Sequence, residues 1–149
     1  MRKNTLLCCL FLCTIFTTQA QEWLTDFDEA KKIAIEKNRK IILVFQGSDW
    51  NGLCKRLDRQ IWSNQEFQDY AKEHYVMLKA DFPKRRENEL SEAQQEKNKK
   101  LANKYNRDGI FPFVVILNKN GEVLGITGYK NVSPYMYIKL LNFFKPKNK

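Results

Sequence analysis

The run Ile41-Ile42-Leu43-Val44-Phe45 constrains the fold of this chain more than any other segment. Five consecutive large apolar residues leave no polar face for a strand to turn toward water. Such a strand must be covered on both sides, as in the interior of a sheet with helices packed on its two faces. The run therefore predicts a central, fully covered strand over residues 41–45.

The rest of the chain alternates between helical periodicity and short apolar runs. Thr25 or Asp26 can cap a first helix, and Ser133-Pro134 provides a cap and a first-turn proline for the last one. Asn120-Gly121 is a strong hairpin signal. The predicted order is helix from 26 to 37–39, strand 41–45, helix 53–61, a helix opened by a Ser63–Glu66 capping box, strand 75–80, helix 91–105, strands 112–117 and 122–127, and a helix from 134.

Residues 1–20 have the layout of a secretory signal peptide. Two basic residues precede an apolar run over 6–16, and small or polar residues follow it up to Ala20. The run is well short of the roughly 20 apolar residues of a membrane-spanning helix. We expect cleavage after Ala20, a periplasmic or secreted product, and no transmembrane segment after signal removal.

Export would leave a single thiol. Cys8, Cys9 and Cys13 lie in the predicted signal peptide and only Cys54 lies outside it, so no intramolecular disulfide can form. Stability must then come from a hydrophobic core, for which residues 21–145 make one domain of ordinary length. We expect the tail 146–149 to be disordered.

The charge of the chain does not point to nucleic acid. The formal net charge is +9 and falls to +7 when two basic residues leave with the signal peptide. An exported protein meets little nucleic acid, and the sequence has no basic stripe interleaved with aromatic residues. We interpret the mixed-charge segment 84–100 as a solvated helix face, with a partner-docking helix as the alternative.

A distinctive segment follows the first central strand: Gly47-Ser48-Asp49-Trp50-Asn51-Gly52-Leu53-Cys54-Lys55-Arg56-Leu57-Asp58. Two later landmarks, Asp81-Phe82-Pro83 and Phe111-Pro112, follow in order. Together they resemble the exported thioredoxin-like proteins of bacteria, in which a strand runs into G-S-D-W-C-x-W-C-K-x-L-D. The resemblance covers nearly the whole mature chain. It implies an α/β, thioredoxin-like fold: a central mixed β-sheet flanked by helices, with an N-terminal helix and a C-terminal β-hairpin plus helix.

The resemblance also implies a redox site that has lost one cysteine. Disulfide exchange needs an attacking thiolate and a second thiol that resolves the mixed disulfide. Asn51 takes the attacking position at the start of a helix but is not a nucleophile, whereas Cys54 keeps the resolving position. The acidic residue that thioredoxins carry on the preceding strand is also missing, because 43–45 is apolar. Asn51-Gly52 could instead form a hairpin turn, but the helical spacing that follows favours a helix start.

Cys54 has two interpretations, a buried structural residue or a reactive monothiol. Lys55, Arg56 and the helix start would lower its pKa, whereas burial behind Trp50 would raise it. His74, the only histidine, falls at the end of another helix, so we expect no Cys-His pair. One cysteine and one histidine are too few for a zinc site, and we expect no metal and no cofactor.

The resemblance also has an implication for the Phe111-Pro112 peptide bond. An arbitrary X-Pro bond is trans in about 95% of cases. The family instead implies a cis bond beside residues 47–51, the loop that carries the motif and that we call the motif loop. The Phe111 backbone would then be free to pair with an extended peptide. We therefore predict a substrate groove formed by Trp50, Phe111 and Pro112, and we assign Phe113 to the core.

Two classes of function remain open from the sequence. The first is a binding or chaperone-like module, without dithiol redox activity, for extended segments of exported or envelope proteins. The second is a monothiol-disulfide oxidoreductase or isomerase that uses Cys54 as its catalytic residue with an external resolving thiol. The exposure and reactivity of Cys54 distinguish them.

Overall fold

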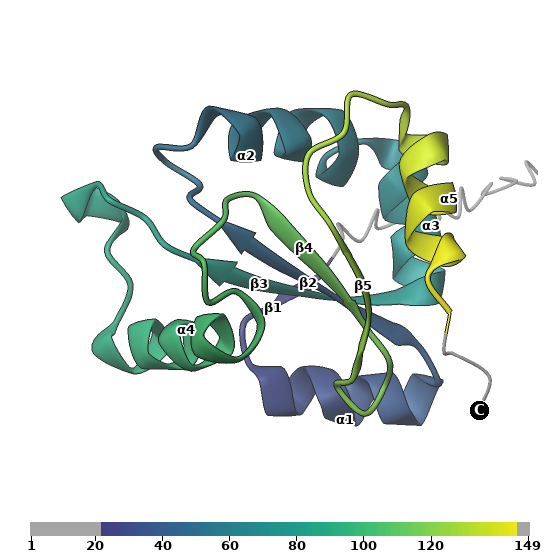
Figure 1. Cartoon of the computed structure of the whole chain (residues 1–149), viewed down its shortest axis with the longest axis horizontal. Coiled ribbons are helices and arrows are strands. Elements are labelled where there is room, and N and C mark those ends of the chain that lie inside the picture. The colour runs from purple at the N-terminus through teal and green to yellow at the C-terminus, as the bar shows by residue number, and fades with distance from the viewer. Residues whose placement is uncertain (1–21, 146–149) are drawn as a thin grey trace, which may run out of the picture.

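The computed structural model describes residues 22–145, so the predicted signal peptide and the tail 146–149 lie outside the described residues. A five-stranded mixed sheet has the order β1-β3-β2-β4-β5 (Figure 1). The strands β1, β3 and β2 are parallel, β4 pairs antiparallel with β2, and β5 pairs antiparallel with β4. Their bounds are β1 Trp23–Leu24, β2 Lys40–Gln46, β3 Tyr75–Asp81, β4 Phe113–Leu117 and β5 Val123–Thr127. Strand β1 is not predicted from the sequence, because two residues are too few to show a period.

Helices cover both faces of the sheet. In Figure 1, α1 and α4 lie on one face and α2, α3 and α5 on the other. The bounds are α1 Phe27–Lys37, α2 Gly52–Leu57, α3 Gln65–His74, α4 Glu92–Tyr105 and α5 Pro134–Phe143, with a π-helical turn Asp58–Trp62 after α2 and a 3-10 turn Arg86–Asn88 before α4. The predicted α/β architecture is confirmed. Among the described residues, no helix is long and apolar enough to cross a membrane.

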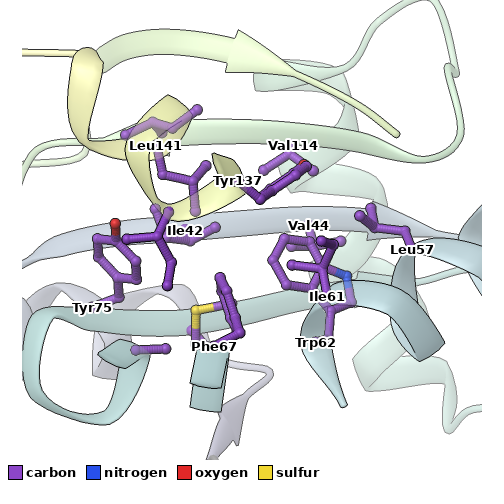
Figure 2. Packing of buried hydrophobic residues seen from close by; sticks show 14 residues of the cluster. Ile42, Val44, Leu57, Ile61, Trp62, Phe67, Tyr75, Val114, Tyr137 and Leu141 are labelled. Carbon is purple, nitrogen blue, oxygen red and sulfur yellow. The ribbon is translucent and has the colours of Figure 1, made fainter. Parts of the chain in front are cut away.

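The central strand divides the core into two clusters. Successive side chains of a strand point to opposite faces, so Ile42 and Val44 pack under α3 and α5 while Leu43 and Phe45 pack against α1 and α4. Figure 2 shows the first cluster, in which the Trp62 ring lies among other buried side chains. The apolar run at 41–45 is fully buried because both sets of helices use it.

Most helix starts agree with the predicted caps. Asp26 caps α1 and Ser133 caps α5 through their side-chain oxygens. At α3 the predicted cap is wrong, because Asn64 and not Ser63 accepts from the Glu66 N–H. Ser63 still has helical backbone angles after the π-helical turn, and its hydroxyl bonds Asp58 instead. An N-cap needs an extended backbone, which only Asn64 has here.

Candidate functional site

The motif loop leaves the C-terminal end of β2, next to the end of β3 and the start of β4. Asn51 has an extended backbone and caps α2, since its Oδ1 accepts from the Cys54 N–H at 3.0 Å. The helix start is therefore confirmed and the hairpin alternative is wrong. The Asn51 Nδ2 also donates to the Phe111 carbonyl at 3.3 Å. One amide thus joins the start of α2 to the loop before β4.

Cys54 is buried, with 4% of its surface exposed. The Gly47 N–H donates to its Sγ at 3.4 Å. Burial raises the pKa of the thiol, the Gly47 hydrogen bond partly opposes this, and the negative charge of Asp81 adds to the increase. The neutral thiol is therefore favoured at neutral pH, and the basic residues that follow Cys54 do not reverse this.

Asp81 brings a carboxylate to the site from a neighbouring strand. It lies opposite Gln46 at the shared end of β2 and β3, and it accepts from the Ser48 N–H at 3.0 Å and the Ser48 hydroxyl at 2.6 Å. The apolar sequence of β2 correctly predicts that it carries no acid, but Asp81 was identified only as part of the landmark 81–83. The parallel pairing of the two strands is the signal that could have found it.

Asp49 anchors a second loop and is not anticipated from the sequence. Its carboxylate accepts from the Lys84 N–H at 3.0 Å, the Arg85 N–H at 2.9 Å and the Asn88 Nδ2 at 3.1 Å. Desolvation alone would raise its pKa, but these three donors, helped by the charge of Arg85, hold the pKa at about 2. Asp49 therefore fixes the segment after β3 beside the motif loop.

We expect Asp49 to stabilise the fold only above strongly acidic pH. Its folded pKa of about 2 lies below the ordinary value of 3.8, so the contribution is fully present above about pH 4 and is lost as pH falls through 2. Thermal unfolding of wild type and Asp49→Asn across this range measures it. The wild type should be more stable at neutral pH, and its advantage should shrink toward pH 2. A constant difference would contradict the role of the charge.

Three aromatic rings line the surface next to Asn51. The Trp50 and Phe111 rings meet edge to face at 5.6 Å, and the Phe82 ring meets Phe111 at 5.5 Å. The Trp50 Nε1 donates to the Phe82 carbonyl at 2.8 Å, and the ring remains 37% exposed. Gly47 permits this arrangement, because a Cβ there would lie 2.3 Å from the Trp50 ring. We call Trp50, Phe82 and Phe111 the aromatic wall.

The predicted groove residues differ in exposure. Phe111-Pro112 is a cis peptide bond, and Pro112 is buried, so the accessible surface comes from Trp50 and Phe111. Phe113 packs on Phe45 with ring centroids 6.3 Å apart, consistent with the core. The Phe111 carbonyl was predicted to be free, but it accepts a hydrogen bond from the Asn51 amide. Within residues 22–145 the Phe111 N–H makes no hydrogen bond, and it is the group left for pairing.

The remaining titratable candidates lie apart from Cys54. His74 stacks on Tyr70 with ring centroids 4.0 Å apart, at the end of α3 just before β3 begins, whereas the site lies where β3 ends. In the described part of the chain, no group of three His, Cys, Asp or Glu residues could hold a metal ion. A cavity of about 310 Å³ borders Cys54, with Ser48, Lys55 and Arg59 among its other lining residues.

With the sheet order, the motif loop and the cis proline described, the chain can be placed among known domain families. The thioredoxin-like domain family matches residues 27–145. The chain belongs to the thioredoxin-like family.

Two curated relatives are a disulfide bond reductase and a thioredoxin-related protein. The disulfide bond reductase DsbH of Chlamydia pneumoniae is 33% identical over 104 residues, which are 70% of this chain and 61% of the relative. The thioredoxin-related protein DsbJ of the same organism is 24% identical over 109 residues, 73% of this chain and 31% of that protein. The chain thus spans less than two thirds of either relative.

Solved structures agree on the fold. A DsbH oxidoreductase superposes with a TM-score of 0.78 at 24% identity, covering 99% of this chain and 96% of that one. A thioredoxin from Thermus thermophilus superposes with a TM-score of 0.63 at 17% identity, covering 84% and 87%. The predicted thioredoxin-like fold is confirmed, and the chain is homologous to thiol-disulfide oxidoreductases of this fold.

Proposed function

We propose that this protein is an exported thioredoxin-fold protein that binds extended segments of other exported or envelope proteins and lacks dithiol redox activity. Asn51 is the observation that carries this proposal. Its amide stands at the attacking position and makes two hydrogen bonds. The amide oxygen accepts from the Cys54 N–H, and the amide nitrogen donates to the Phe111 carbonyl. A side chain bonded in this way holds the site together and performs no disulfide exchange.

The aromatic wall supports a binding role. Exposed aromatic rings beside an unpaired backbone N–H suit an extended peptide, which gains affinity from main-chain hydrogen bonds and from apolar contact. Trp50 and Phe111 supply the rings, and the Phe111 N–H supplies the donor. The Asn51 bond to the Phe111 carbonyl limits main-chain pairing there, so the rings contribute most of the contact.

One observation favours the monothiol alternative. A cavity borders Cys54, and the basic residues Lys55 and Arg59 also line it. Against it stand the 4% exposure of the thiol and its raised pKa. A buried neutral thiol is a poor nucleophile, because the thiolate is the attacking species.

Cysteine chemistry and peptide binding test the two candidates separately. We expect the wild type to show no turnover in dithiol-driven insulin reduction and Cys54 to react slowly with iodoacetamide while folded. Extended peptides should change the fluorescence of Trp50 equally in wild type and Cys54→Ser, and Trp50→Phe should remove that change. Turnover that disappears in Cys54→Ser would establish the monothiol enzyme instead. Absence of any peptide binding would contradict the binding role.

A further inference from the structure

A cavity of about 320 Å³ lies between the 82–90 segment and α4, next to the aromatic wall. Its lining combines apolar residues, Phe82, Pro83 and Leu90, with the basic residues Lys84, Arg85 and Arg86. We call the cavity the basic pocket and these three basic residues its cationic rim. A pocket lined by apolar and cationic side chains suits a ligand that combines a negative charge with apolar surface.

The positive charge of the basic pocket is only partly neutralised. Lys99, which also lines it, pairs with Glu96 at 2.8 Å, but within residues 22–145 neither Arg85 nor Arg86 forms an ion pair. The lining also holds two acidic residues, Glu89 and Asp81, and the Asp81 carboxylate keeps its charge while it accepts from the Ser48 hydroxyl and N–H. Asp49, outside the lining, interacts with the charge of Arg85. The lining itself has four basic residues against two acidic ones, an excess of positive charge.

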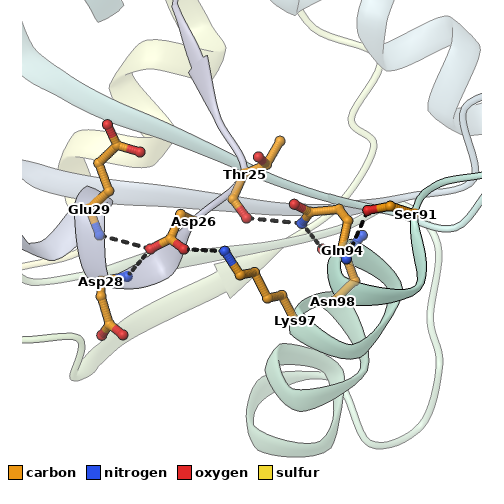
Figure 3. A network of polar contacts seen from close by, with 8 residues as sticks. All are labelled: Thr25, Asp26, Asp28, Glu29, Ser91, Gln94, Lys97 and Asn98. Carbon is orange, nitrogen blue, oxygen red and sulfur yellow. Dashed lines mark hydrogen bonds and ion pairs between the residues drawn. The ribbon is translucent and has the colours of Figure 1, made fainter.

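The walls of the basic pocket are held in place by hydrogen bonds. Asp49 fixes the backbone of its rim, and on the opposite wall the Asn98 Nδ2 donates to the Asp81 carbonyl at 2.8 Å while the Gln95 Nε2 donates to the Leu90 carbonyl at 2.8 Å. Figure 3 shows how Lys97 and Gln94 tie α4 to the residues that begin α1. A preformed pocket loses little entropy when a ligand binds.

The basic pocket and the aromatic wall are continuous. Phe82 belongs to both, since its ring packs on Phe111 while it also lines the pocket. The Lys84 Nζ lies 4.0 Å from the centroid of the Trp50 ring, at the boundary between them. A chain that lies along the aromatic wall would therefore reach the cationic rim at one end only.

We propose that the basic pocket binds acidic side chains of the same extended segment that contacts the aromatic wall, so that the protein selects segments with Asp or Glu at one end. This rests on the proposed binding function and names its preferred client chemistry. Carboxylates pair well with the forked guanidinium groups of Arg85 and Arg86. It also changes the interpretation of segment 84–100: α4 remains a largely solvated face, whereas residues 84–86 form a recognition surface.

Matched peptides test this proposal. The probes are capped, extended peptides of about ten residues that carry a Glu-Glu pair, or the isosteric Gln-Gln pair, at either end. We expect the wild type to bind the peptide with glutamates at one particular end about fivefold more tightly than its glutamine counterpart, with the preference weakening at high salt. Glutamates at the other end should give no such gain.

Charge-reversal variants distinguish the effect of the pocket on peptide binding from the effect of the net positive charge of the protein. Arg85→Glu/Arg86→Glu should abolish the preference for the acidic peptide and leave the glutamine peptide bound as before. Lys32→Glu/Lys37→Glu, two exposed lysines on α1, gives the same change in net charge and should keep the preference. Circular dichroism and thermal unfolding check that both variants fold.

The outcomes distinguish this proposal from the function on which it rests. If glutamine and glutamate peptides bind equally well to the wild type, or if both reversals reduce the preference alike, the basic pocket is not the acidic subsite, while peptide binding stands. If no peptide binds, the binding function and this proposal are both overturned. Binding of anionic lipid vesicles that depends on Arg85 and Arg86, without a peptide preference, would assign the pocket to a membrane surface instead.

Discussion

Asn51→Cys is expected to give the protein a disulfide and measurable dithiol-driven insulin reduction. The residue at position 51 caps α2, and its side chain already reaches the Cys54 N–H across the first helical turn. A cysteine there would place its sulfur near the free N–H groups of the helix start, which favour the thiolate. Cys54 would then act as the resolving thiol.

The substitution also removes the Asn51 hydrogen bonds. Loss of an N-cap costs about 1 kcal/mol, and the freed Phe111 carbonyl becomes available to a peptide. We therefore expect the reduced variant to be slightly less stable than wild type, and the oxidised variant to recover stability because the bridge restricts the unfolded chain. Tighter peptide binding by the reduced variant would fit the same geometry.

Mass and activity measurements check this expectation. Oxidised Asn51→Cys should lose two hydrogens relative to its reduced form and turn over in the insulin assay. Asn51→Ser keeps a capping oxygen without a thiol, and Asn51→Cys/Cys54→Ser keeps a thiol without a partner, so neither should show bridge or turnover. If Asn51→Cys stays reduced under oxidising conditions, the two side chains are not adjacent and the reconstruction of the site is wrong.

Trp62→Ala is expected to have the largest effect on stability, a loss of about 3–5 kcal/mol. Trp62 is 2% exposed and meets the rings of Trp23, Phe67 and Tyr137 edge to face, at centroid distances of 5.9, 4.9 and 5.4 Å. Removing the indole leaves a cavity among side chains from both ends of the chain. A loss of this size is a large fraction of the stability of a domain.

Trp50→Ala is the matched control, because it removes the same side chain from a partly exposed position. Its loss should be smaller, on the order of 1–2 kcal/mol, since 37% of the surface of Trp50 already faces water. Urea unfolding of both variants, followed by circular dichroism, gives the comparison. Equal losses would mean that Trp50 belongs to the core, and the aromatic wall would then have no binding surface.

The sequence predicted the features that depend on neighbouring residues. Helical and strand patterns identified every α-helix and strand except β1, and the apolar run at 41–45 identified the strand that both core clusters share. The π-helical turn after α2 and the 3-10 turn before α4 were not predicted. Asn51 as a helix start followed from the spacing behind it. These predictions hold because period, caps and turns are set by residues a few positions apart.

The tertiary structure alone decided what surrounds the site. Asp49 binds residues 35 to 39 positions away, Asp81 reaches Ser48 across 33 positions, and Asn51 reaches Phe111 across 60. The burial and raised pKa of Cys54 belong to the same set, because they depend on how strands and loops meet at the end of β2 and β3. A local pattern determines which elements form, but the side chains that meet between elements follow from the register and packing of the whole sheet.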